Sequence, residues 1–287
     1  ERGEMGQGLL LVAFSQAGVF ALIPAGTLAF SHVSAFGSYQ RRVVPLVALQ
    51  TAGPKSFDTE AVAKYSAAVT VQMGSVAAAF GAIDAATDAI LGGPLPWQAV
   101  TALFWVLSLK SRVLNPLDNS RPDLNKVVEG EKSRGFNDRT MPSWTPPGVT
   151  FPIMWVLVVG PLRAFSSTLV WEATGMHLLN PVLLCIMLHL SVGDTWNCVN
   201  NVERRLGAAV PGVACVLASA LFAAYQYSLV SPFAGELLGL TTVWITVAGA
   251  LIADTWRINS AETGGKWEGE PLFPYRGDVS TRFWFDR

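Results

Sequence analysis

Long runs without charged side chains are the feature that most constrains this chain. Residues 5–40 contain no Asp, Glu, Lys or Arg, and residues 206–235 form a second such run. A helix needs about 20 mainly apolar residues to cross the hydrocarbon core of a bilayer, because that core is about 30 Å thick and each residue adds about 1.5 Å. Only 14% of the 287 residues are charged, whereas soluble domains average about 25%. The sequence therefore predicts an all-α integral membrane protein.

Seven segments are candidate membrane spans. They are residues 8–33, 65–83, 89–109, 140–162 with a continuation to 171, 173–193 with a continuation to 202, 206–235 and 237–253. The second is only weakly hydrophobic, because small residues such as Ala67, Gly74, Ala78 and Gly81 make up much of it. Small residues allow helices to approach closely in membranes, so we expect this helix to be packed between neighbours.

The positions of the basic residues favour seven spans. With seven, the segments 41–64, 110–143, 204–205 and 257–287 lie on one side of the membrane and hold 18 of the 20 Lys and Arg residues. Without the second span, Arg41 and Arg42 would move to the opposite side, against the positive-inside rule. The sequence therefore predicts an N-terminus on the charge-poor side and a C-terminus on the basic side. Arg163 is left inside a span.

A motif rich in tryptophan and proline opens the fourth candidate span. Residues 142–155 read PSWTPPGVTFPIMW, which resembles the signature of the TspO/MBR family, the tryptophan-rich sensory or translocator proteins. Trp196 followed by the Arg204–Arg205 pair, and Trp244 followed by the WRIN sequence at 256–259, resemble later motifs of that family. The resemblance covers residues 94–259 and implies a five-helix transmembrane bundle. It leaves an N-terminal extension with two transmembrane helices at 1–93 and an aromatic-rich tail at 260–287.

The resemblance also implies a pocket between helices for porphyrins, sterols and other apolar ligands. The positions that keep the family's residue type there are Trp144, Trp155, Trp196, Trp244 and Ala248. Val149 stands where the family usually has Trp, and Asn200 and Asn201 replace a typical aromatic pair. We expect the bundle to be kept while much of the pocket lining is changed. Anchoring at the membrane surface is the alternative role for the tryptophans.

Ionisable residues inside the candidate spans mark either functional positions or buried partners. They are Arg163 in the fourth span and Asp194 in the fifth, together with Asp254 near the basic end of the seventh. Asp84 and Asp88 are one helical turn apart and are candidate partners for Arg163. Alternatively, the long side chain of Arg163 could extend to the membrane surface, which is called snorkelling. His189 is a candidate axial ligand for the metal of a pigment or other tetrapyrrole, and hydrogen bonding between helices is the alternative role.

The sequence contains no motif typical of catalysis or of a metal site. We find no P-loop, nucleophile elbow or His/carboxylate metal set, so we expect neither an enzyme nor a resident metal. A net charge of −1 argues against nucleic acid as a partner. The tail holds aromatic residues suited to docking on this chain's own loops or on a partner. They are Trp267, Phe273, Tyr275, Phe283, Trp284 and Phe285.

Two function hypotheses follow. In the first, the chain is a non-catalytic accessory or scaffold subunit of an organellar membrane complex, with a photosystem or antenna assembly in the plastid thylakoid as the specific prediction. A start at Glu1 suggests a removed targeting peptide or a trimmed chain. The basic side would then face the stroma, or the matrix if the membrane is mitochondrial. In the second, the chain binds or transports a tetrapyrrole, sterol or lipid. Candidate ligands are chlorophyll, carotenoid, porphyrin and lipid, and the expected partners are membrane lipids and proteins of the complex.

Overall fold

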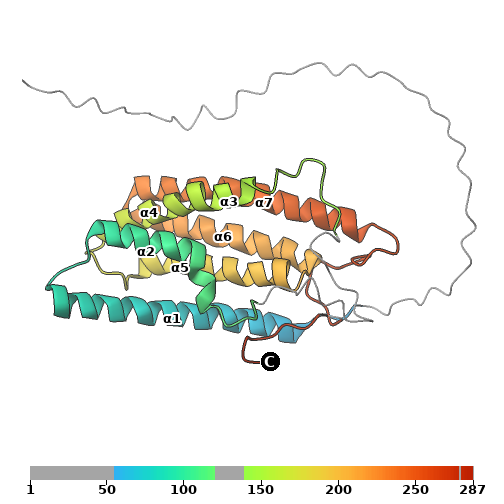
Figure 1. Cartoon of the computed structure of the whole chain (residues 1–287), viewed down its shortest axis with the longest axis horizontal. Helices are drawn as coiled ribbons and strands as arrows, with labels where there is room; N and C mark the ends of the chain where they lie inside the picture. Colours follow the sequence, from blue (N-terminus) through green and yellow to red (C-terminus); the bar gives the residue numbers. More distant parts are fainter. Residues whose placement is uncertain (1–54, 120–138, 278, 287) are drawn as a thin grey trace, which may run out of the picture. The chain divides into compact units, whose positions relative to one another are not determined.

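The structure is a computed structural model that describes residues 55–119, 139–277 and 279–286, so the expected span at 8–33 lies outside the described residues. The described part is helical, with two isolated β-bridges, and Figure 1 shows its long helices side by side in a bundle. The helices are α1 (Thr59–Leu91), α2 (Trp97–Lys110), α3 (Thr150–Ile153), α4 (Gly160–Ala173), α5 (Pro181–Asn197), α6 (Leu206–Val230) and α7 (Pro232–Ser260). The 3₁₀ turn η1 (Ser111–Leu114) follows α2, and the π-helical segments η2 (Met154–Val159) and η3 (Cys198–Val202) continue α3 and α5.

Five helical segments in the described residues are long and apolar enough to cross a membrane. They are Thr59–Leu91, Thr150–Ala173, Pro181–Val202, Leu206–Val230 and Pro232–Ser260. The prediction of a helical membrane protein is confirmed. The count of seven spans stays a prediction.

Local sequence signals explain where these helices begin and end. Before α1, α5 and α7, a side-chain oxygen of Asp58, Asn180 or Ser231 accepts a first-turn N–H, as N-capping residues do. The span expected to start at 173 starts instead at Pro181. The reason is that α4 runs on to Ala173 and the turn after it holds two residues with positive φ, Gly175 at 90° and Met176 at 61°.

The third expected span differs most from the structure. Gly92 takes the left-handed conformation (φ 65°) that ends α1, so the first residues of the expected span at 89–109 belong to α1. The remaining helix, α2, has 14 residues, or about 21 Å, which is short of the roughly 30 Å hydrocarbon core. It packs on α4, where the Thr101 and Thr168 hydroxyls lie 2.9 Å apart.

Helix α1 contacts the bundle along one face. Its buried residues follow a helical spacing of mainly four and are Ala61, Ala68, Gln72, Val76 and Phe80. Positions three or four apart share a helix face, so burying this face turns Ala67, Gly74 and Ala78 outward, where they are exposed. A Cβ on Gly81, by contrast, would lie 3.2 Å from the Leu179 side chain. Packing of this helix between neighbours stays a prediction, because the expected span at 8–33 lies outside the described residues.

The described parts of the four basic segments meet at one end of the bundle. Phe57 forms a β-bridge with Tyr275, and Leu117 forms another with Phe283. The Asn259 amide bonds both backbone groups of Thr140. At the opposite end, the Asp84 carboxylate accepts hydrogen bonds from the N–H groups of the turn before α5. This arrangement agrees with the expected alternation, while the side of the membrane that each end occupies stays a prediction.

The first turn of α6 lies directly beneath the C-terminal tail. A Cβ atom added to Gly207 would lie 2.0 Å from the carbonyl oxygen of Pro271 and 3.2 Å from Nε1 of Trp256. That indole nitrogen donates to the carbonyl of Glu270 at 2.9 Å. The absence of a side chain at Gly207 therefore allows the tail backbone to rest on the helix.

We predict that Gly207→Ala lowers the stability of the protein by about 1–3 kcal/mol, because the added methyl group displaces the tail backbone. Thermal unfolding in detergent micelles, followed by circular dichroism, measures this change. The control is Gly239→Ala, since a Cβ there meets nothing within 4 Å and alanine favours the helix by roughly 0.5–1 kcal/mol. Equal midpoints for the two variants would contradict the prediction.

Candidate functional site

A buried polar chain joins three helices of the bundle. Nη2 of Arg163 on α4 lies 2.6 Å from Nε2 of His189 on α5. Nδ1 of His189 lies 3.0 Å from the hydroxyl oxygen of Ser219 on α6. That hydroxyl donates to the Val216 carbonyl at 2.8 Å. Arg163 and His189 are 5% and 1% exposed, whereas Ser219 is half-buried, so the charged end of this network lies inside the bundle.

The guanidinium group fixes the protons along this chain. Because arginine only donates hydrogen bonds, Nε2 of His189 must accept, and the neutral imidazole carries its proton on Nδ1. Nδ1 then donates to Ser219, whose hydroxyl hydrogen is directed to Val216. Both ring nitrogens are engaged, so His189 would have to release Arg163 or Ser219 before it could ligate the metal of a tetrapyrrole.

Arg163 contacts an aromatic face but no carboxylate. Its guanidinium carbon lies 5.5 Å from the ring centroid of Trp155, a cation–π distance. Nε is buried without a hydrogen-bond partner, and no ion pair within 4.0 Å involves Arg163 in the part of the chain that the structure describes. The expected pairing with Asp84 or Asp88 is absent there, because Asp84 caps the turn before α5 and Asp88 is exposed near the end of α1.

Two of the candidate pocket tryptophans pack on the same apolar cluster. Trp155 and Trp196 both contact the cluster formed by Val216, Ala220 and Ile245. Trp196 comes from α5 and donates from Nε1 to the Ala209 carbonyl at 2.9 Å. A Cβ at position 212 would lie 2.8 Å from this indole, so glycine there lets the ring lie against α6. Trp155 is thus in contact with the apolar cluster and with Arg163.

The other three candidate pocket residues lie differently. Trp244 packs against Phe151 with ring centroids 5.8 Å apart, and its Nε1 is buried without a hydrogen-bond partner. Ala248 is half-buried one turn further along α7. Trp144 is 45% exposed and donates to Asp254 at 2.9 Å. Asp254 also pairs with Arg257 at 2.6 Å, so Trp144 and Asp254 form a polar contact near the end of α7.

Asp194 belongs to a second polar network, which connects α1 to α5. Its carboxylate accepts hydrogen bonds from Gln72 and Ser111, both at 2.7 Å. Asn115 donates to Gln72 at 2.9 Å and to Thr195 at 3.1 Å. Sequence reasoning missed both partners of Asp194, Gln72 and Ser111. Gln72 could have been identified, because a polar amide inside an apolar run indicates a buried hydrogen-bond partner.

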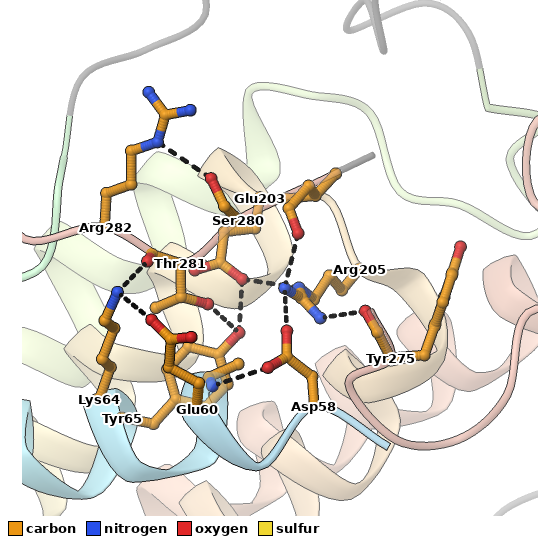
Figure 2. A network of polar contacts seen from close by, with 12 residues as sticks. Asp58, Glu60, Lys64, Tyr65, Glu203, Arg205, Tyr275, Ser280, Thr281 and Arg282 are labelled. Atoms are coloured by element: carbon orange, nitrogen blue, oxygen red, sulfur yellow. Dashed lines mark hydrogen bonds and ion pairs between the residues drawn. The ribbon is translucent and has the colours of Figure 1, made fainter. Parts of the chain in front are cut away.

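A third polar network holds the C-terminal strap, which we define as residues 267–277 and 279–285. Arg205 lies at its centre, between η3 and α6, with a side chain only 2% exposed. Figure 2 shows the guanidinium directed at Asp58, Glu203 and the strap backbone. The ion pairs measure 3.1 Å to Asp58 and 2.9 Å to Glu203. The guanidinium also donates to the carbonyls of Tyr275 and Val279, each at 2.9 Å, and the Tyr65 hydroxyl donates to Glu203.

The charges in this network stabilise one another. Burial lowers the pKa of Arg205, but Tyr65, Glu203 and Asp58 outweigh burial and hold the pKa above its ordinary value. Burial likewise raises the pKa of Asp58, yet the Ala61 N–H and the Arg205 guanidinium bring it below the ordinary 3.8. Both groups are therefore charged at neutral pH.

The six aromatic docking candidates divide into two sets. Four have side chains or backbone bridges that contact segments outside the strap: Trp267, Phe273, Tyr275 and Phe283. Trp267 is 3% exposed and donates to the Arg204 carbonyl. Trp284 and Phe285 are 61% and 60% exposed, and their rings meet edge to face at 5.4 Å. Docking on a separate partner stays a prediction that concerns chiefly these two.

We predict that Asp58→Asn loosens the strap at neutral pH, because Arg205 loses one buried carboxylate. The expected cost of about 1–2 kcal/mol corresponds to roughly 5- to 30-fold faster hydrogen exchange, measured by mass spectrometry on peptides that cover the strap. Asp88→Asn is the control, since this aspartate is exposed on the same helix.

The contact between Asp58 and Arg205 makes the stability of the strap depend on pH. The pKa of Asp58 is lower in the folded protein than its ordinary 3.8, so its stabilising effect is complete above that pH and is lost as the pH falls through the lowered pKa. After correction for intrinsic exchange rates, the difference between wild type and Asp58→Asn should shrink below pH 3.8. A difference that is constant down to pH 2 would contradict this assignment.

Comparison with known proteins agrees with this architecture. Residues 124–257 match the sequence profile of the TspO/MBR family. The human translocator protein is 25% identical over 144 residues, which cover 50% of this chain and 85% of that protein. Protein CrtK of Rhodobacter capsulatus is 24% identical over 131 residues, 44% of this chain and 79% of CrtK. The matched region begins ahead of α3 and ends within α7, so α1 and the strap lie outside it. Residues 124–257 of this membrane protein therefore match a TspO/MBR family domain.

Proposed function

We propose that this protein is a non-catalytic membrane binder of an apolar ligand, of the tetrapyrrole, sterol or lipid class, held within its helical bundle. The observation that carries the proposal is the convergence of Trp155 and Trp196 on one apolar cluster. Aromatic side chains supply large apolar contact areas and well-defined ring geometry to a ligand. The human relative is named a translocator protein, which supports movement of the ligand as well as its binding.

The position of Trp155 suits a ligand site. Trp155 lies in the π-helical segment η2, and such segments are frequent at functional sites. The segment places Trp155 beside Arg163, so the ligand would meet an indole face and a cation together. The pocket candidates Trp244 and Ala248 would extend the ligand-contacting surface along α7.

A second candidate function is that of an accessory subunit in a photosynthetic membrane assembly of the thylakoid. The exposed pair Trp284 and Phe285 favours it, because aromatic residues of this kind anchor protein interfaces. In this arrangement the strap end of the bundle would face the stroma, or the matrix in a mitochondrial membrane. The two functions are compatible, since the ligand site and the exposed pair use different residues.

We predict that the purified protein binds at least one of protoporphyrin IX, cholesterol and palmitate, and that Trp155→Leu weakens this binding roughly two- to tenfold, the effect of losing one aromatic contact. Absorbance titration measures the porphyrin, and equilibrium dialysis with labelled compounds measures the other two. Trp284→Leu is the matched control, because that indole is 61% exposed and lies in the strap.

Failure of all three compounds to bind the folded protein would contradict the binder proposal. The subunit proposal has its own test, which is gentle solubilisation followed by size-exclusion chromatography of the native protein. Stoichiometric co-migration with a pigment complex, lost in a Trp284→Ser, Phe285→Ser double variant, would support it. Migration as a free monomer would contradict it.

A further inference from the structure

A charged guanidinium inside a membrane bundle requires compensation. Transferring a charge out of water costs several kcal/mol unless an opposite charge and hydrogen bonds offset that cost. Arg163 lies within the candidate span Thr150–Ala173 and is 5% exposed. Among the described residues, its hydrogen-bonding and ring partners are the neutral His189 and the face of Trp155.

The donors of Arg163 are only partly used. Nη2 is bound to His189, whereas Nε is buried and has no acceptor. Nη1 likewise has no hydrogen bond to any residue of the described ranges. The carboxylate of Asp194 is close enough to interact electrostatically with Arg163. It is not within ion-pair distance, however, and it already accepts hydrogen bonds from Gln72 and Ser111. The guanidinium therefore presents positive charge and open N–H groups beside an apolar aromatic wall.

Resting on the proposed function, we propose that Arg163 binds the carboxylate of an otherwise apolar ligand, whose body lies against Trp155 and the cluster of Val216, Ala220 and Ile245. A carboxylate is planar and accepts two parallel hydrogen bonds from a guanidinium. It carries one negative charge, which matches the single charge of Arg163. A phosphate monoester carries up to two and would leave an excess negative charge in a low-dielectric site, so a carboxylate is favoured.

His189 is a positioning residue in this proposal. Its Nε2 holds Nη2 of Arg163, and its Nδ1 is fixed by Ser219, so the imidazole orients the guanidinium without adding charge. A carboxylate in place of the imidazole would neutralise Arg163 and remove the attraction for an anionic ligand. The neutral acceptor therefore keeps the positive charge available.

The test compares acids with their methyl esters, which share the same apolar body. The pairs are protoporphyrin IX with its dimethyl ester and palmitate with methyl palmitate, and hexadecyl phosphate is added to distinguish a phosphate from a carboxylate. The full-length protein in nanodiscs of neutral lipid should bind at least one acid about tenfold or more tightly than its ester, the effect of one charge-assisted contact. Arg163→Gln should abolish this preference while ester affinity changes less than twofold, and Arg163→Lys should retain part of it.

The positioning role is tested separately. His189→Gln keeps an acceptor for Arg163 and should preserve the preference for the acid, whereas His189→Leu should lose it. Elution as a single species and an unchanged helical circular dichroism spectrum establish that each variant is folded. If Arg163→Gln fails this criterion, the acid–ester comparison in wild type and Arg163→Lys decides the proposal.

The outcomes separate this inference from the proposed function. Equal affinity for acid and ester in every pair that binds would overturn the inference and leave the binder proposal standing. Binding of hexadecyl phosphate tenfold tighter than either carboxylate would overturn the choice of a carboxylate. Binding of none of the five compounds would overturn this inference, and failure of cholesterol to bind as well would overturn the proposed function.

Discussion

The inability of hydrocarbon to form hydrogen bonds is the constraint on which this structure depends. Backbone groups inside a bilayer must pair within the protein, which favours helices. The same constraint governs side chains, and the described polar residues within the bundle form connected groups. Arg163 bonds His189, Asp194 accepts from Gln72, and Thr101 pairs with Thr168. Each of these contacts joins two helices and so helps to fix how they pack.

Prediction from the sequence was most successful for features that depend on one continuous segment of the chain. Charge-free runs located the helices, and the alternation of basic segments correctly grouped those that meet at the strap end. The Pro146–Pro147 pair lies just before α3, as expected of residues that lack an N–H for a helix interior. The family motif around Trp155 identified the domain, because its spacing is a property of the chain and needs no knowledge of the packing.

Sequence reasoning was weakest for contacts between distant segments. Asp84 was a reasonable partner for Arg163 because both were expected near the same membrane surface. Its carboxylate instead accepts hydrogen bonds from a turn almost a hundred positions later in the sequence. The partner that Arg163 does have, His189, was considered as a metal ligand or as a residue that hydrogen-bonds between helices, but it was not matched with Arg163. The Arg205 network was missed altogether, because Asp58, Glu203 and the strap backbone come together only when three segments fold onto one another. The length of α2 was overestimated because only charged residues were used to bound the span, although the GGPLP sequence at 92–96 signals a break in the helix.

The strap and the ion pairs of Arg205 connect the family domain to chain segments on both sides of it. Asp58 precedes the region shared with the relatives, Val279 follows it, and both bind one guanidinium that belongs to it. A fragment cut to the shared region would keep this buried cation but lose the acceptors that the flanking segments provide. The buried charge of Arg205 is therefore compensated by segments on both sides of the matched region, so a substitution at Asp58 and a displacement of the strap act on the same guanidinium.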